Sequence, residues 1–111
     1  MPGVPELSPT EFNQRWPDHA RSADVVLLDV REPAELEIAS VASALHIPMR
    51  EIPARLAELD RDTALVVMCH SGGRSRRVAE YLLANGFSSV FNLSGGIDAW
   101  STQLDSHVPR Y

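Results

Sequence analysis

Short apolar runs without alternating polar residues constrain the fold of this chain more than any other feature. Two of them, Val25–Asp29 and Ala64–Met68, are rich in valine and leucine. Such a run is typical of a strand buried on both faces, which is the usual state of strands in a parallel sheet. Weaker strand patterns occupy residues 44–47 and 90–93. The sequence therefore predicts a mainly parallel sheet.

Segments with helical patterns separate these strands. Ser8, Pro9 and Glu11 form a helix start with a capping box, and this helix is expected to end near Trp16. Further helices are expected over residues 33–36, 53–59, 75–85 and 97–104. The alternation implies right-handed crossovers and an α/β fold whose central sheet is flanked by helices on both faces. The length predicts a single domain over residues 1–111.

Charge and composition exclude several classes of protein. The net charge of −5 argues against a general nucleic-acid binder, which normally presents a basic face to phosphate. No apolar stretch is long enough to span a membrane, and the first residues lack the pattern of a signal peptide, so we expect a cytoplasmic protein. A lone cysteine cannot form an internal disulfide or a multi-cysteine metal site.

That cysteine, Cys69, follows the strand 64–68 directly, where sites form in open α/β sheets. Gly72 and Gly73 let the next residues turn tightly and direct backbone N–H groups at an anion, and a helix begins just beyond them. These groups favour a thiolate, with a pKa below the free-cysteine value of about 8.5. A lone cysteine is more often a small buried apolar residue, but packing alone requires neither the glycines nor Arg74.

The loop Cys-His-Ser-Gly-Gly-Arg-Ser at residues 69–75 resembles the active-site loop of single-domain rhodaneses, a family of sulfurtransferases. Two further motifs carry the likeness, namely Asp-Val-Arg at residues 29–31 with Glu35, and Gly-Gly-Ile-Asp-Ala-Trp at residues 95–100. The likeness extends over nearly the whole chain. It implies the rhodanese-like fold, a parallel sheet of about five strands between layers of helices.

The resemblance also implies a ping-pong sulfurtransferase reaction without a metal or organic cofactor. Cys69 would be the catalytic residue, taking a sulfane sulfur from thiosulfate or from a persulfide or polysulfide donor. The resulting persulfide would pass its sulfur to a thiol, to cyanide or to an accepting protein, with no role for nucleic acid or membrane. The residues expected to bind substrate are His70, Ser71, Gly72, Gly73, Arg74 and Ser75.

Some positions depart from the family pattern. Tandem-domain thiosulfate sulfurtransferases tend to have an arginine where this chain has Glu35. We therefore expect Glu35 to form a structural ion pair with Arg31, and persulfide or polysulfide donors to be preferred to thiosulfate. Asp29 is expected to hold the loop around Arg31. Residues 39–48 lack the glycines common in the family, and His46 is expected to be a hydrogen-bonded structural residue.

Two other functions remain open alternatives. Cysteine phosphatases and arsenate reductases place five residues between the cysteine and the arginine of their phosphate loop, whereas four residues separate Cys69 from Arg74. The shorter loop should be too tight for phosphate. The second alternative is a non-catalytic rhodanese-like regulatory or binding module, but inactive members commonly lose the cysteine that this chain retains.

Overall fold

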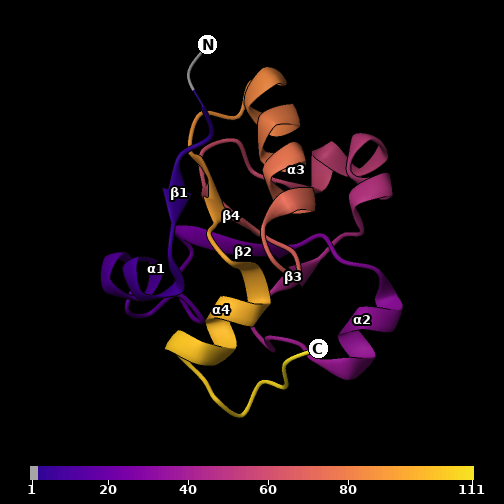
Figure 1. The fold of residues 1–111 in the computed structure, drawn as a ribbon. Coiled ribbons are helices and arrows are strands. Elements are labelled where there is room, and N and C mark those ends of the chain that lie inside the picture. Colours follow the sequence, from indigo (N-terminus) through magenta and orange to yellow (C-terminus); the bar gives the residue numbers. More distant parts are fainter. Residues whose placement is uncertain (1–2) are drawn as a thin grey trace.

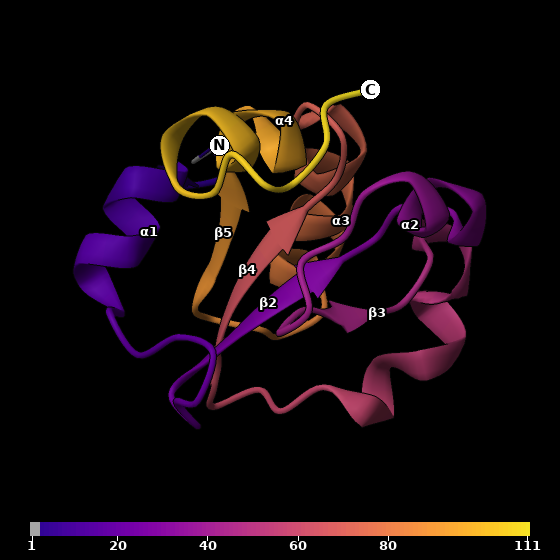
Figure 2. The same cartoon turned by 90° about the horizontal axis from the view of Figure 1, so that it is seen from below.

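The computed structural model describes residues 3–111, and its strands form one parallel sheet. In chain order the elements are β1 (Glu6–Leu7), α1 (Pro9–Arg15), β2 (Val25–Asp29), α2 (Pro33–Ile38), β3 (Leu45–His46), the 3₁₀ segments η1 (Met49–Glu51) and η2 (Pro53–Glu58), β4 (Ala64–Met68), α3 (Gly73–Ala84), β5 (Val90–Leu93) and α4 (Gly96–Gln103). The five strands are arranged in the order β1-β5-β4-β2-β3, most of which can be followed in Figure 2. Their pairings are parallel, which confirms the predicted sheet.

The centre of the sheet is buried on both faces, as the apolar runs predicted. All five residues of β4 are buried, and β2 pairs with β4 from Val25–Ala64 to Asp29–Met68. Successive side chains point to opposite faces, so Leu65 and Val67 belong to one apolar cluster while Val66 belongs to the other.

Each apolar cluster is covered by its own set of helices. On one face α3 contributes Val78 and Leu82, beside the 3₁₀ segments. On the other face α1 contributes Phe12 and α4 contributes Trp100. Figure 1 shows this division, with α1 and α4 on the lower left and α3 with the 3₁₀ segments on the upper right. The predicted layers on both faces are therefore confirmed.

Local details differ from the expectations. The helix expected over residues 53–59 is 3₁₀ in type and kinks at Arg55, with φ −121° and ψ 18°. A segment this short gains little from α-helical hydrogen bonds, and the side chain of Arg55 instead bonds to Glu51 and Glu58. The strand β1 was not predicted, because two residues carry no recognisable pattern. Helix α3 begins at Gly73 rather than at residue 75.

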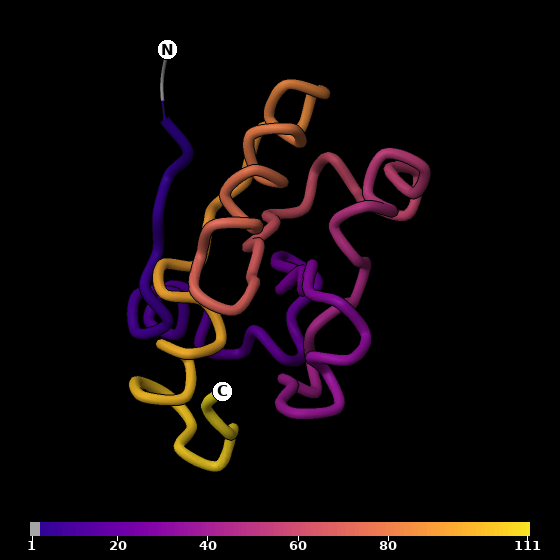
Figure 3. Tube along the Cα trace, turned by 45° about the vertical axis from the view of Figure 1, so that its right-hand side comes forward, coloured from indigo at the N-terminus to yellow at the C-terminus, as the bar shows by residue number. Residues whose placement is uncertain are grey.

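The C-terminal segment returns from α4 toward α2, as Figures 1 and 3 show. It is fastened by the hydroxyl of Ser101, which donates to the carbonyl oxygen of Val108 at 2.5 Å. The side chain of Arg110 bonds to both carboxylate oxygens of Asp98 at 2.8 and 3.1 Å. Within residues 3–111, no helix combines the length and apolar character needed to cross a membrane.

A fully buried arginine joins these segments near the end of β2. Arg31 is 0% exposed and bonds to the carboxylate of Asp29 at 2.7 Å, to the carbonyl oxygen of Ala39 at 2.9 Å and to the hydroxyl of Tyr111 at 2.8 Å. The Asp29 carboxylate also accepts from the backbone N–H of Arg31, so its predicted structural role is confirmed. His46 is hydrogen-bonded as expected, with Nε2 2.7 Å from the carbonyl oxygen of Arg31.

Removing one partner of this buried pair should destabilise the protein strongly. Asp29→Ala leaves the Arg31 charge buried without its carboxylate, so we expect a loss of about 3–5 kcal/mol in the free energy of unfolding, measured by urea denaturation. Glu58→Ala is the control, because it removes a carboxylate from an exposed pair with Arg55 and should change stability far less. Equal losses in both variants would show that burial of the pair does not matter.

Candidate active site around Cys69

The cysteine loop lies at the carboxyl end of β4, at the centre of the sheet. The first turn of α4 holds it there: the N–H of Ile97 donates to the carbonyl oxygen of Cys69 at 2.9 Å, and the N–H of Asp98 donates to that of His70 at 3.2 Å. Gly96 allows this close approach, because a Cβ atom at that position would overlap both carbonyl groups. The Gly-Gly-Ile motif therefore serves to fix the cysteine loop from outside.

The sulfur of Cys69 faces hydrogen-bond donors of its own loop. The backbone N–H of Gly72 donates to Sγ at 3.1 Å, and the hydroxyl oxygen of Ser75 lies 3.3 Å from Sγ. Gly72 has φ +116°, a backbone conformation that favours glycine and lets the loop turn into α3. The residue as a whole is 1% exposed, so the sulfur sits at the bottom of the loop rather than on its rim.

These surroundings shift the pKa of the Cys69 thiol in two directions. Burial raises the pKa, but donors at the base of the loop outweigh it, so the pKa lies below its ordinary value. The groups that can donate to the thiolate are the Ser75 hydroxyl, when its proton turns toward the sulfur, and the backbone N–H groups of Ser75, Gly72 and Ser71. The direction agrees with the thiolate expected from the sequence.

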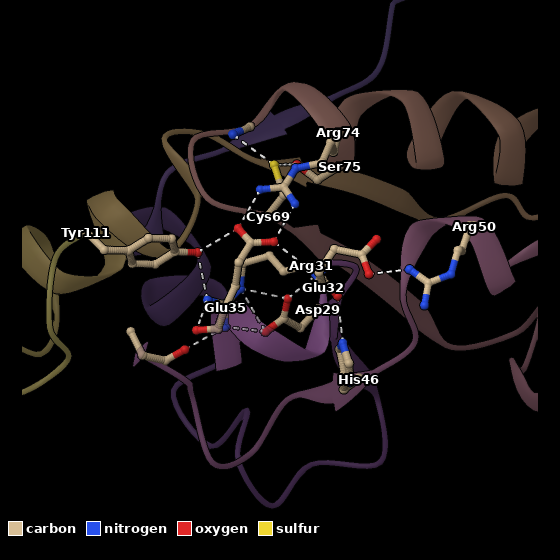
Figure 4. Close-up of polar contacts among 12 residues, drawn as sticks. Asp29, Arg31, Glu32, Glu35, His46, Arg50, Cys69, Arg74, Ser75 and Tyr111 are labelled. Atoms are coloured by element: carbon tan, nitrogen blue, oxygen red, sulfur yellow. Dashed lines mark hydrogen bonds and ion pairs between the residues drawn. The ribbon is translucent and has the colours of Figure 1, made fainter. Parts of the chain in front are cut away.

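The guanidinium of Arg74 is bound by a carboxylate instead of being free beside the sulfur. Its two terminal nitrogens donate to the two oxygens of Glu35 at 2.6 and 2.8 Å, as Figure 4 shows. These bonds hold the pKa of Glu35 at about 2. The prediction that Glu35 forms an ion pair with Arg31 is therefore wrong. The Arg31 side chain contacts only the backbone carbonyl of Glu35, at 3.4 Å, because its charge is already matched by Asp29.

Tyr111 completes this polar network and was not anticipated. Its hydroxyl accepts from Arg31 and donates to Glu35 at 3.0 Å, so it joins the two ion pairs. Its ring stacks on His70, with centroids 4.1 Å apart and planes 10° apart. Tyr111 lies 76 positions from Glu35 in the chain, and no local motif signals such a contact.

The remaining predicted residues surround the sulfur at different depths. His70 is half-buried under Tyr111, whereas Ser71 and Gly73 are exposed. Ser75 is 0% exposed and bonds to Asn92 of β5, a residue that the sequence analysis missed. The sequence did offer a signal for Asn92, because a polar residue in a buried strand usually has a specific hydrogen-bond partner. In residues 3–111, no group of three or more His, Cys, Asp or Glu side chains is arranged to hold a metal ion.

The fold and this loop together define an α/β protein with a cysteine site at the end of its central strand. The family description "Rhodanese-like domain" matches residues 10–103. A sulfurtransferase of Allochromatium vinosum is 40% identical over 88% of this chain and 89% of that protein. Thiosulfate sulfurtransferase GlpE of Pseudomonas syringae is 36% identical over 84% of this chain and 91% of that protein.

Solved structures agree. The rhodanese-like domain protein of Staphylococcus aureus superposes with a TM-score of 0.80 at 29% identity, covering 97% of this chain and 99% of that one. The chain belongs to the rhodanese-like family, which confirms the resemblance inferred from residues 29–35, 69–75 and 95–100.

The close approach at Gly96 can be tested directly. Gly96→Ala places a Cβ against the carbonyl groups of Cys69 and His70, at a φ of +58° that alanine rarely adopts. We expect a loss of about 1–3 kcal/mol in stability and a slower reaction of the Cys69 thiol with iodoacetamide. Gly73→Ala is the control, because a Cβ there meets no atom within 4 Å. Unchanged thiol reactivity in Gly96→Ala would contradict the role of α4 in fixing the loop.

Proposed function

We propose that this protein is a sulfurtransferase that carries sulfane sulfur as a persulfide on Cys69. The observation that carries the proposal is the set of loop N–H groups directed at one sulfur at the end of β4. The names of the related proteins from Allochromatium vinosum and Pseudomonas syringae support an activity of this type. Cys69 is the proposed catalytic residue, and residues 70–75 are proposed to bind substrate.

In the first half-reaction, the Cys69 thiolate attacks the sulfane sulfur of the donor. A bond forms between Sγ and that sulfur, while the bond between the sulfane sulfur and the rest of the donor breaks. The donor leaves with the electron pair, as a thiolate or as sulfite. The negative charge then lies on the outer sulfur of the persulfide, which backbone N–H groups of the loop can stabilise.

In the second half-reaction, a nucleophilic acceptor attacks the outer sulfur. A bond forms between the acceptor and that sulfur, the sulfur–sulfur bond to Cys69 breaks, and the Cys69 thiolate returns. A low pKa suits this step, because a more stable thiolate is a better leaving group. The proposed acceptors are a small thiol, cyanide or a sulfur-accepting protein. Each step uses only the cysteine and its loop, so no cofactor is required.

The engaged state of Arg74 favours persulfide or polysulfide donors over thiosulfate. Thiosulfate carries two negative charges, and a free guanidinium fork would be its natural partner. Here both terminal nitrogens of the Arg74 guanidinium are bonded to Glu35, whose carboxylate adds a negative charge beside the cysteine loop. A persulfide or polysulfide carries at most one negative charge next to its sulfane sulfur and therefore meets a smaller electrostatic barrier at this carboxylate.

We also propose that the protein acts in the cytoplasm. The mechanism requires Cys69, the only cysteine of the chain, to remain a free thiol between turnovers. Thiol-reducing systems of the cytosol maintain that state, whereas oxidising compartments do not.

Intact mass spectrometry tests the persulfide. Wild-type protein incubated with glutathione persulfide and then desalted should gain the mass of one sulfur atom, and Cys69→Ser should gain none. Subsequent cyanide should remove the added sulfur and yield thiocyanate. If no sulfane donor produces an adduct on the folded wild type, the protein is a non-catalytic binding module and the proposal is wrong.

Donor preference tests the role of Glu35. Glu35→Gln removes the negative charge while keeping the size of the side chain, so we expect kcat/KM for thiosulfate to rise about fivefold, as for a partly exposed ion pair of about 1 kcal/mol. The value for glutathione persulfide should change less. Glu32→Gln is the matched control, because its carboxylate pairs with Arg50. A wild type that already prefers thiosulfate would contradict the proposed donor class.

A further inference from the structure

A chain of side-chain contacts connects Cys69 to the short N-terminal strand β1. The hydroxyl oxygen of Ser75 lies 3.3 Å from Sγ of Cys69 and 2.6 Å from Oδ1 of Asn92. The amide nitrogen of Asn92 lies 3.1 Å from a carboxylate oxygen of Glu6 and 3.1 Å from the carbonyl oxygen of Gly72. Ser75 is 0% and Asn92 3% exposed, so the contact between these two side chains is shielded from water, whereas Glu6 at the other end of the chain of contacts is exposed.

The acceptors at one end of this chain determine the orientation of Asn92. An ionised carboxylate and a backbone carbonyl can only accept hydrogen bonds, so both must face the NH₂ group of the amide. Glu6 is held in place by the hydroxyl of Ser94, which donates to it at 2.8 Å, and by Arg76 at 3.8 Å. The carbonyl oxygen of Asn92 therefore faces Ser75.

The short contact between Ser75 and Asn92 then locates a proton. Two oxygen atoms 2.6 Å apart repel each other unless a proton lies between them, and the Ser75 hydroxyl is the group that carries one. A hydroxyl has a single proton to donate. While it bonds to Asn92, the Ser75 oxygen presents only lone pairs to the sulfur of Cys69.

We infer that Asn92, oriented by Glu6 and by the carbonyl of Gly72, is a positioning residue that competes with Cys69 for the proton of the Ser75 hydroxyl. The protonated thiol suits this arrangement, because its S–H can donate to the Ser75 oxygen. The thiolate gains the Ser75 hydrogen bond only by drawing the proton away from Asn92. The loop N–H groups stabilise the thiolate without this competition.

The competition favours the sulfur-loaded enzyme, a consequence that rests on the proposed function. In a persulfide the negative charge lies on the outer sulfur, and Sγ becomes a neutral and weak acceptor. The Ser75 hydroxyl can then keep its hydrogen bond to Asn92, because the neutral Sγ gains little from accepting that bond. Asn92 thus destabilises the empty thiolate relative to the persulfide, and so promotes loading.

A double-mutant cycle measured by alkylation tests this arrangement. The rate of reaction of Cys69 with iodoacetamide is followed against pH, and its midpoint gives the pKa of the thiol without any sulfur donor. The other charged or titratable groups around the loop are His70, Arg74 with Glu35, Tyr111, and Arg76 beside Glu6. The substitutions used in the test leave all of these groups in place, except for Glu6→Ala.

We expect Asn92→Ala to lower the midpoint by about one pH unit, because the Ser75 proton becomes available to the thiolate. Ser75→Ala should shift the midpoint by less than about half a unit when Asn92 is present, but raise it by about one unit in the Asn92→Ala background. Glu6→Ala should lower the midpoint by a smaller amount than Asn92→Ala. Thr10→Ala is the control and should leave the midpoint unchanged, because the Thr10 hydroxyl bonds to Gln103 and to no member of this chain of contacts.

A rise of one unit or more for Ser75→Ala in the wild-type background would overturn the inference, since Ser75 would then already donate to the sulfur. Circular dichroism verifies the fold of each variant. If Asn92→Ala does not fold, Ser75→Ala and Glu6→Ala decide the question. Because alkylation needs no sulfur transfer, a protein that forms no persulfide would refute the proposed function while leaving this test intact.

Discussion

The hydrogen bond from the N–H of Ile97 to the carbonyl oxygen of Cys69 determines which way the cysteine loop faces. It holds the backbone carbonyl of Cys69 against α4, while the side-chain sulfur points the other way, toward the N–H of Gly72. This arrangement depends on Gly96, whose missing side chain lets α4 approach the carbonyl groups of the loop. The loop is therefore a junction between the central strand β4, helix α3 and helix α4, and its geometry is set by all of them.

Charges around the loop are paired in an alternating series. Asp29 binds Arg31, Arg31 binds the hydroxyl of Tyr111, that hydroxyl binds Glu35, and Glu35 binds Arg74. Each member limits the freedom of the next. As a result, the charge of Arg74 beside the cysteine loop is already compensated by Glu35. The thiolate is therefore stabilised mainly by backbone N–H groups of the loop. Backbone donors are fixed by the fold and need no reorganisation when charge develops on sulfur.

Local patterns in the sequence were sufficient for the sheet, its helical layers and the cysteine loop. The runs at residues 25–29 and 64–68 are buried on both faces, and the capping box at Ser8 is present. These features depend on neighbouring residues, so a single sequence reveals them.

The errors at the site share the opposite property, because they concern residues far apart in the chain. Glu35 was assigned to Arg31, four positions away, but its partner is Arg74 at a separation of 39. Glu6 reaches Asn92 across 86 positions, and Tyr111 reaches Arg31 across 80. Side-chain contacts at such separations follow from the order of strands in the sheet and from the path of the C-terminal segment. Neither can be read from residue spacing.

The central claim is that the pKa of the Cys69 thiol lies below that of a free cysteine because its own loop directs N–H groups at the sulfur. Titration of the thiolate ultraviolet absorbance in the wild-type protein, with Cys69→Ser as the blank, measures this most directly. The account predicts a midpoint below the value of about 8.5 for a free cysteine. A midpoint at or above that value would contradict it, because burial would then outweigh the hydrogen bonds of the loop.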